Sequence, residues 1–129
     1  MEIHRILGKG YDEAVYKDAL AIELQREGIP FARERKYKIE YKGVPLPHSY
    51  FADFVIWDRI LFEAKAAAQL VEANVKQVLN YMAASKLELG LLVNFGADSL
   101  EWKRGVMSKT LSPFNGNSRD QSRRLDQSF

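Results

Sequence analysis

The chain has 129 residues, of which 47% are hydrophobic, and this length and composition suit one folded domain. It has no cysteine and two histidines, which excludes disulfides, thiolate metal sites and a cysteine nucleophile and leaves carboxylates, lysines and tyrosines for catalysis. The formal net charge of +2 is too small to indicate a nucleic-acid-binding protein by itself.

The N-terminus and the uncharged stretches bear on the location of the protein. Position 2 is acidic, and the longest uncharged stretches have about ten residues, half of what a membrane-spanning helix requires. We therefore expect a soluble cytoplasmic protein with neither signal peptide nor membrane span.

Residues 11–27 follow a helical pattern that stops at Gly28, with Pro30 just beyond. The apolar positions form two neighbouring stripes, Val15, Ala19 and Ile22 in one and Tyr16, Leu20 and Leu24 in the other. This pattern predicts an amphipathic helix.

Residues 31–41 alternate between apolar and charged side chains, which predicts a half-exposed strand. The turn Lys42-Gly43 and the prolines Pro45 and Pro47 should close it. Residues 33–42 hold five basic and two acidic side chains, typical either of a solvated strand or of one that faces phosphates. In the second case Arg35, Lys36 and Lys38 are the candidate substrate contacts.

The next segments alternate between strand and helix patterns. An apolar strand over 50–57 and a return strand from Ile60 should form an antiparallel hairpin around Asp58-Arg59. An alanine-rich helix is expected over 66–85, with Val71, Val75, Val78 and Met82 on its apolar side. Residues 89–95 predict a strand buried on both faces, and 100–107 an edge strand.

The order of these elements, αβββαβ, predicts an α/β fold with one mixed sheet flanked by helices. We expect residues 1–111 to form this domain. Residues 112–129 are polar and almost without periodicity, which predicts a flexible C-terminal tail.

Three charged residues, Asp53, Glu63 and Lys65, interrupt the apolar hairpin. A buried carboxylate destabilises a fold by several kcal/mol unless it is paired or binds a metal. A two-residue loop would place Asp53 opposite Ala64, whereas a three-residue loop or a bulge would place it beside Glu63. A shared site therefore predicts an odd loop or a bulge in this hairpin.

In that register, the carboxylates of Asp53 and Glu63 and the carbonyl of Ala64 form a set of hard oxygen ligands for Mg²⁺ or Mn²⁺. Lys65 adds a positive charge that can orient an attacking water or stabilise a pentacovalent phosphate. The alternative for so short a pattern is an exposed aspartate with an ordinary Glu–Lys pair.

Both helices carry polar residues that suit such a site. Glu13 and Tyr16 lie three positions apart on the first helix, after Gly10, and Gln77 lies one turn before Tyr81 on the second. Each pair alone is also typical of a helix at the edge of a core.

Together these residues resemble the GxxExxY proteins, a branch of the PD-(D/E)XK nuclease superfamily, which has a restriction-endonuclease-like fold. The matches are Gly10, Glu13 and Tyr16 for the name motif, Asp53 with Glu63-Ala64-Lys65 for the nuclease signature, and Gln77 with Tyr81 for the QxxxY element of exonuclease-type members. The similarity spans roughly residues 3–107. Ala52 replaces the proline of the "PD" name, a structural position.

The resemblance implies a divalent-metal-dependent nuclease acting on DNA or, as a second choice, RNA. Asp53 and Glu63 would hold the metal, Lys65 would stand beside the water, and Glu13 would be a further ligand or hold a metal-bound water. Tyr16, Gln77 and Tyr81 would contact the substrate, and a homodimer is compatible with cutting two strands. The alternative is a silent nucleic-acid- or protein-binding module on the same fold.

Overall fold

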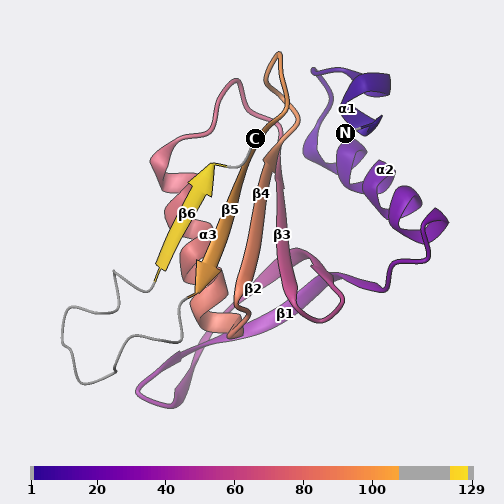
Figure 1. The fold of residues 1–129 in the computed structure, drawn as a ribbon. Coiled ribbons are helices and arrows are strands. Elements are labelled where there is room, and N and C mark those ends of the chain that lie inside the picture. The colour runs from indigo at the N-terminus through magenta and orange to yellow at the C-terminus, as the bar shows by residue number, and fades with distance from the viewer. Residues whose placement is uncertain (1, 108–122, 128–129) are drawn as a thin grey trace.

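The structure is a computed structural model that describes residues 2–107 and the backbone of residues 123–127. One six-stranded sheet forms the middle layer, with α1 and α2 against one face and α3 against the other (Figure 1). The helices are α1 (Glu2–Leu7), α2 (Glu13–Arg26) and α3 (Glu72–Ser85). The strands are β1 (Phe31–Tyr41), β2 (Val44–Ile56), β3 (Ile60–Lys65), β4 (Leu89–Asn94), β5 (Glu101–Met107) and β6 (Arg123–Gln127).

The strands follow one another across the sheet in chain order, from β1 to β6. All neighbours pair antiparallel except β3 and β4, which are parallel because α3 crosses over between them. The predicted αβββαβ order and the mixed α/β sheet are confirmed. None of the helices in the described part of the chain has the length and apolar composition that crossing a membrane requires.

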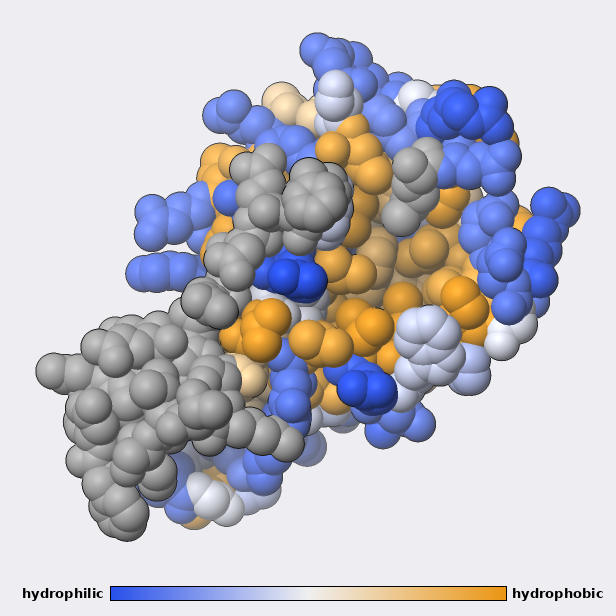
Figure 2. Space-filling view, viewed as in Figure 1, coloured by the Kyte–Doolittle hydropathy of each residue, from blue (hydrophilic) through white to orange (hydrophobic). Residues whose placement is uncertain are grey.

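Each face of the sheet carries its own hydrophobic core. On α2, the stripe of Tyr16, Leu20 and Leu24 is buried, whereas Ile22 of the other stripe is 51% exposed. Val78 and Met82 of α3 form the second core with residues of the opposite face. In Figure 2, hydrophobic residues gather over the middle of the visible face.

The hairpin between β2 and β3 has a three-residue loop, residues 57–59, because Ile56 pairs with Ile60. The N–H of Arg59 donates to the carbonyl of Ile56, and both residues between them have positive φ. This is the arrangement of a type I′ turn, whose twist matches that of antiparallel strands. The predicted odd loop is confirmed.

The second long helix begins six residues later than predicted, because residues 66–71 bind to the sheet instead. The Asn94 side chain accepts a hydrogen bond from Ala67 N–H (2.9 Å) and donates to Ala67 O (2.9 Å) and to Glu101 Oε1 (2.8 Å). Glu101 Oε1 also accepts from Leu70 N–H (3.1 Å). These bonds satisfy the backbone of the segment without helical hydrogen bonds.

Several other boundaries differ from the predictions. Pro45 and Pro47 lie inside β2 instead of closing β1, at a register shift where the ladder is irregular. β5 is not an edge strand because β6 pairs with it. β6 also falls within the predicted tail, of which residues 112–122 and 128–129 lie outside the described residues. The six-residue α1 is too short for a periodic signal.

Gly96 is the basis of a test of this packing. A Cβ at position 96 would lie 2.5 Å from the backbone N and O of Ala67, whereas one at Gly90 would meet the flexible side chain of Met82 at 2.6 Å. We expect Gly96→Ala to lower the free energy of unfolding by about 3 kcal/mol and Gly90→Ala by about 1 kcal/mol, measured by urea denaturation. Equal losses would contradict the close approach of these two backbone segments.

Candidate functional site

The register of the β2–β3 hairpin brings two acidic residues together. The ladder pairs Ile56 with Ile60 and ends at Phe54 and Phe62, so its continuation places Asp53 opposite Glu63. Beyond that point the N–H of Ala64 donates to Asp53 Oδ2 (2.8 Å) instead of to the backbone of β2. The Asp53 carboxylate therefore stands in a fork between the two strands.

The backbone of β2 changes direction at Asp53. Ala52 belongs to the core under α3 and Phe54 to the core under α1 and α2, although residues two apart in a regular strand share a face. On the neighbouring strand Glu34 has a φ of 56°, and the described β1–β2 register pairs the residues on both sides of Glu34 and Asp53 but not these two. This irregularity explains why simple alternation could not assign a face to Asp53.

Glu63 is a buried carboxylate that lacks a full set of partners. The residue is 7% exposed, and its Oε1 has no hydrogen-bond partner in the structure. Desolvation, followed by the charge and hydrogen bond of Asp53, raises the pKa of Glu63 to about 9. An orphaned, buried oxygen beside a second acid is an arrangement that a cation would stabilise.

The carbonyl of Ala64 faces the same fork. The carbonyl of Lys65 accepts a hydrogen bond from Phe95 N–H (2.8 Å) on the β4 side. Because successive carbonyls of a strand point to opposite edges, that of Ala64 points toward β2. The donor set is thus two carboxylates and one carbonyl, which fits Mg²⁺ or Mn²⁺ by its hard oxygen chemistry.

Two residues of α3, Gln77 and Tyr81, lie beside this pair of acids. Lys65 Nζ donates to Gln77 Oε1 (3.4 Å). Burial, with a further contribution from the charge of Glu63, raises the pKa of Tyr81, whose hydroxyl interacts with Gln77. The Tyr81 ring stacks on Tyr50 with centroids 3.9 Å apart. The structure therefore brings Lys65, Gln77 and Tyr81 together next to Glu63.

Lys17 of α2 is a residue of the site that the sequence analysis missed. Its Nζ lies 3.1 Å from Glu34 Oε1 and 3.3 Å from Asp53 Oδ1, and its side chain is 17% exposed. Burial alone would lower the pKa of Lys17, but the hydrogen bonds and charges of Glu34 and Asp53 outweigh it and raise that pKa. A lysine beside a buried tyrosine on a helix carries no signal of this role, since its partners lie on other elements.

Comparison with known proteins bears directly on this site. A family model described as the PD-(D/E)XK nuclease superfamily matches residues 1–105, which contain every candidate residue of this site. The chain belongs to the PD-(D/E)XK nuclease superfamily. Its α/β sheet with flanking helices is the restriction-endonuclease-like fold. No curated protein matches the chain.

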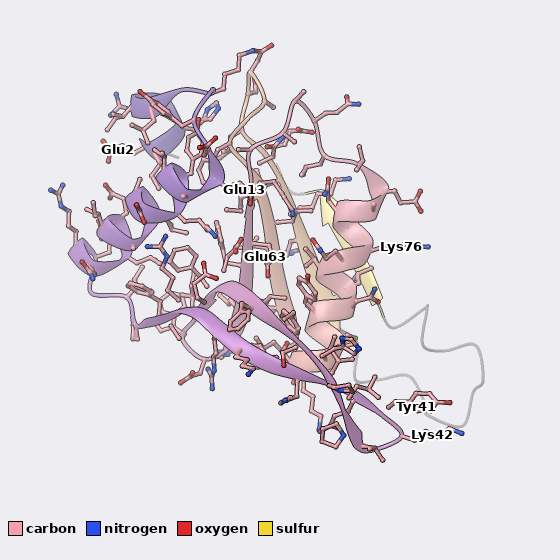
Figure 3. All side chains as sticks on the ribbon, turned by 180° about the vertical axis from the view of Figure 1, so that it is seen from behind. Glu2, Glu13, Tyr41, Lys42, Glu63 and Lys76 are labelled. Atoms are coloured by element: carbon pink, nitrogen blue, oxygen red, sulfur yellow. The ribbon has the colours of Figure 1, made fainter. Side chains whose placement is uncertain are left out.

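Glu13, the remaining acid that the resemblance to these nucleases suggested, is the first residue of α2 and is exposed. Figure 3 shows it at the end of that helix, while Glu63 lies between α2 and α3. Within the described part of the chain, no three acidic or histidine side chains are grouped closely enough to hold a metal ion. The structure thus assembles the pair of Asp53 and Glu63, and the role of Glu13 stays a prediction.

Tyr16 does not fit the substrate contact predicted from the nuclease motif. It is 0% exposed, and its ring stacks on Phe95 with centroids 4.9 Å apart. Its hydroxyl donates to Gly8 O (2.6 Å) and accepts from Tyr11 N–H (3.3 Å). Tyr16 therefore ties the segment between α1 and α2 to the core, which is a structural role.

The basic residues of β1 are exposed. Lys36 lies opposite Phe51 in the register with β2, and Lys38 lies opposite Ser49. Arg35 is already engaged, since it forms an ion pair with Asp58 (2.9 Å). Lys36 and Lys38 are thus the better candidates for contact with a phosphate.

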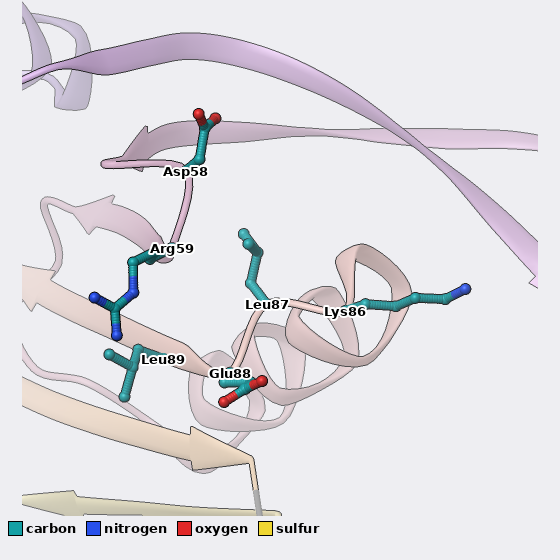
Figure 4. A pocket seen from close by; sticks show the side chains of 6 residues that line it. All are labelled: Asp58, Arg59, Lys86, Leu87, Glu88 and Leu89. Atoms are coloured by element: carbon teal, nitrogen blue, oxygen red, sulfur yellow. The ribbon is translucent and has the colours of Figure 1, made fainter. Parts of the chain in front are cut away.

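A pocket of about 340 Å³ lies away from the pair of Asp53 and Glu63. Asp58, Arg59 and residues 86–89 line it, at the ends where β3 and β4 begin (Figure 4). Glu63 and Lys65 belong to the other half of β3. The pocket is lined by charges of both signs but by none of Asp53, Glu63 and Lys65, so it is not the candidate site.

The buried position of Glu63 gives a stability prediction. The folded protein keeps a proton on Glu63 up to about pH 9, whereas the unfolded chain releases it near 4.5, so the free energy of unfolding falls as the pH rises between these values. We expect Glu63→Gln to remove this slope, so that its free energy of unfolding rises relative to that of the wild type by about 4 kcal/mol between pH 5.5 and 8.5.

The measurement is urea denaturation at several pH values with a chelator present. Asp98→Asn is the matched control, because Asp98 is an exposed acid paired with Lys9. Parallel pH profiles of the wild type and Glu63→Gln would contradict the burial of an uncompensated acid.

Proposed function

We propose that this protein is a divalent-metal-dependent nuclease that hydrolyses phosphodiester bonds of DNA. The observation that carries the proposal is the pair of Asp53 and Glu63 in the β2–β3 fork, with a buried, unpartnered Glu63 Oε1 and Lys65 on the same strand. This arrangement lowers the stability of the fold. Residues that lower stability in this way are typically retained because they serve catalysis. Membership in a nuclease superfamily supports the same reaction class.

The metal would be held by the two carboxylates and by the carbonyl of Ala64, with Glu13 at the end of α2 able to hold an outer water. When bound, a divalent cation supplies positive charge that activates the attacking water and neutralises the scissile phosphate. Binding would also offset the desolvation and the charge of Asp53, which together raise the pKa of Glu63.

Lys65 is the proposed catalytic cation. Side chains alternate along β3, so Lys65 and Glu63 share a face, and Gln77 Oε1 accepts a hydrogen bond from the Lys65 ammonium. An ammonium held this way orients the attacking water and stabilises charge on the pentacovalent phosphate. The new bond joins the water oxygen to phosphorus as the bond to the 3′ oxygen breaks, which leaves a 5′ phosphate and a 3′ hydroxyl.

The substrate would lie across the site between α3 and the β1–β2 hairpin. Lys36 and Lys38 on β1 would contact backbone phosphates without reading sequence, while Gln77 and Tyr81 would line the α3 side. Such contacts predict an affinity that falls steeply as the salt concentration rises.

Metal binding is the first test. We expect isothermal titration calorimetry to find one Mn²⁺ or Mg²⁺ site in the wild type and affinities at least tenfold weaker in Asp53→Asn and Glu63→Gln, because each change removes a charged ligand. Asp98→Asn should bind as the wild type does, since Asp98 is an exposed acid paired with Lys9. Equal affinities in all four proteins would exclude this metal site.

Nuclease activity is the second test, on linear, nicked and single-stranded DNA and on RNA with Mg²⁺ or Mn²⁺. We expect Lys65→Met to lower the rate by about 10²- to 10⁴-fold while metal affinity changes little, because the ammonium acts on charge in the transition state. Cleavage at the wild-type rate in both Lys65→Met and Asp53→Asn would contradict the proposal. Nucleic-acid binding without metal dependence or cleavage would favour the silent binding module instead.

A further inference from the structure

The ammonium of Lys17 occupies one oxygen of the proposed metal ligand Asp53. It lies 3.3 Å from Asp53 Oδ1 and 3.1 Å from Glu34 Oε1, while Asp53 Oδ2 accepts the hydrogen bond of Ala64 N–H. We propose that Lys17 is a resident counter-ion that competes with the divalent cation for Asp53, and that Glu34 holds Lys17 once the cation binds. This inference rests on the proposed function and names a regulation of the same site.

The competition follows from the distances. The Asp53 carboxylate is 13% exposed, so solvent screens its surroundings weakly. A divalent cation bound to Asp53 would share this carboxylate with the Lys17 ammonium, and two cations held by one weakly screened carboxylate repel each other. Release of the ammonium from Asp53 therefore accompanies binding of the cation.

Glu34 is placed to receive the released ammonium. Its side chain is 49% exposed, so it can follow Lys17 without burying a new charge. Its φ of 56° is an uncommon value for a residue other than glycine, and it occurs where the pairing of β1 with β2 skips Glu34 and Asp53. Such a strained backbone is typical of a residue whose direction serves a site.

A neighbouring ion pair provides the matched control. Asp18, the next residue on α2, pairs with Arg33 of β1 at 2.7 Å. This pair also joins α2 to β1, but its partners differ from those of Lys17. Asp18→Asn therefore measures the effect of loosening α2 from β1 without changing the surroundings of Asp53.

The experiment measures Mn²⁺ affinity by calorimetry in the wild type, Lys17→Met, Glu34→Gln and the double variant. Lys17→Met should bind Mn²⁺ about three- to tenfold more tightly, and Glu34→Gln about two- to fivefold more weakly. In the Lys17→Met background, Glu34→Gln should have no further effect, because Glu34 acts through Lys17. Asp18→Asn should bind as the wild type does, and circular dichroism verifies that each variant is folded.

Two results would overturn the inference while the metal site itself stands. Lys17→Met could bind Mn²⁺ no more tightly than the wild type, which would assign Lys17 to fixing the position of Asp53. If the effects of Lys17→Met and Glu34→Gln on Mn²⁺ affinity were additive, each residue would influence the affinity independently, through its charge alone. Failure of the proposed function gives a different result, namely no Mn²⁺ binding by the wild type.

Discussion

The hydrogen bond from Ala64 N–H to the Asp53 carboxylate is the interaction on which the site depends. It replaces a backbone bond between β2 and β3, and it forms where their ladder ends. The three-residue turn sets the register that makes it possible, because a loop one residue shorter would place Asp53 opposite Ala64. The strands can then separate without leaving an amide unsatisfied, and the fork between them holds both acids.

This arrangement places two acidic side chains close together in a buried position, which is electrostatically unfavourable. Glu63 is buried beside a second carboxylate, and its Oε1 has no partner. Two features reduce the repulsion between the acids. Glu63 is protonated, since its pKa is raised to about 9, and the ammonium of Lys17 pairs with Asp53. In the proposed function a divalent cation would replace both, and the same residues would then link stability, pH and metal binding.

Much of the fold could be predicted because its signals are local. The stripe of α2 and the alternation of β1 repeat with the period of their element, and the continuous apolar run of β4 is typical of a strand buried on both faces. The start of α3 could not be predicted in this way, because alanine-rich residues 66–71 favour a helix until Asn94 and Glu101 bind their backbone. The same reasoning applies to Tyr16, a tyrosine at motif spacing whose hydroxyl the structure directs to Gly8 instead of a substrate.

The amino-acid sequence by itself determined the α/β order, the candidate acids Asp53 and Glu63, Lys65 beside them, and the requirement for an odd loop. The two acids, the lysine and the odd loop follow from spacing along one hairpin, whose two strands are joined by a short turn and are therefore neighbours. Only the tertiary structure decided which oxygens are buried, that Lys17 reaches Asp53 and Glu34, and that Glu13 stands at the exposed end of α2. Those facts depend on how α2 packs across the sheet, and residues that meet across such a contact share no period in the sequence.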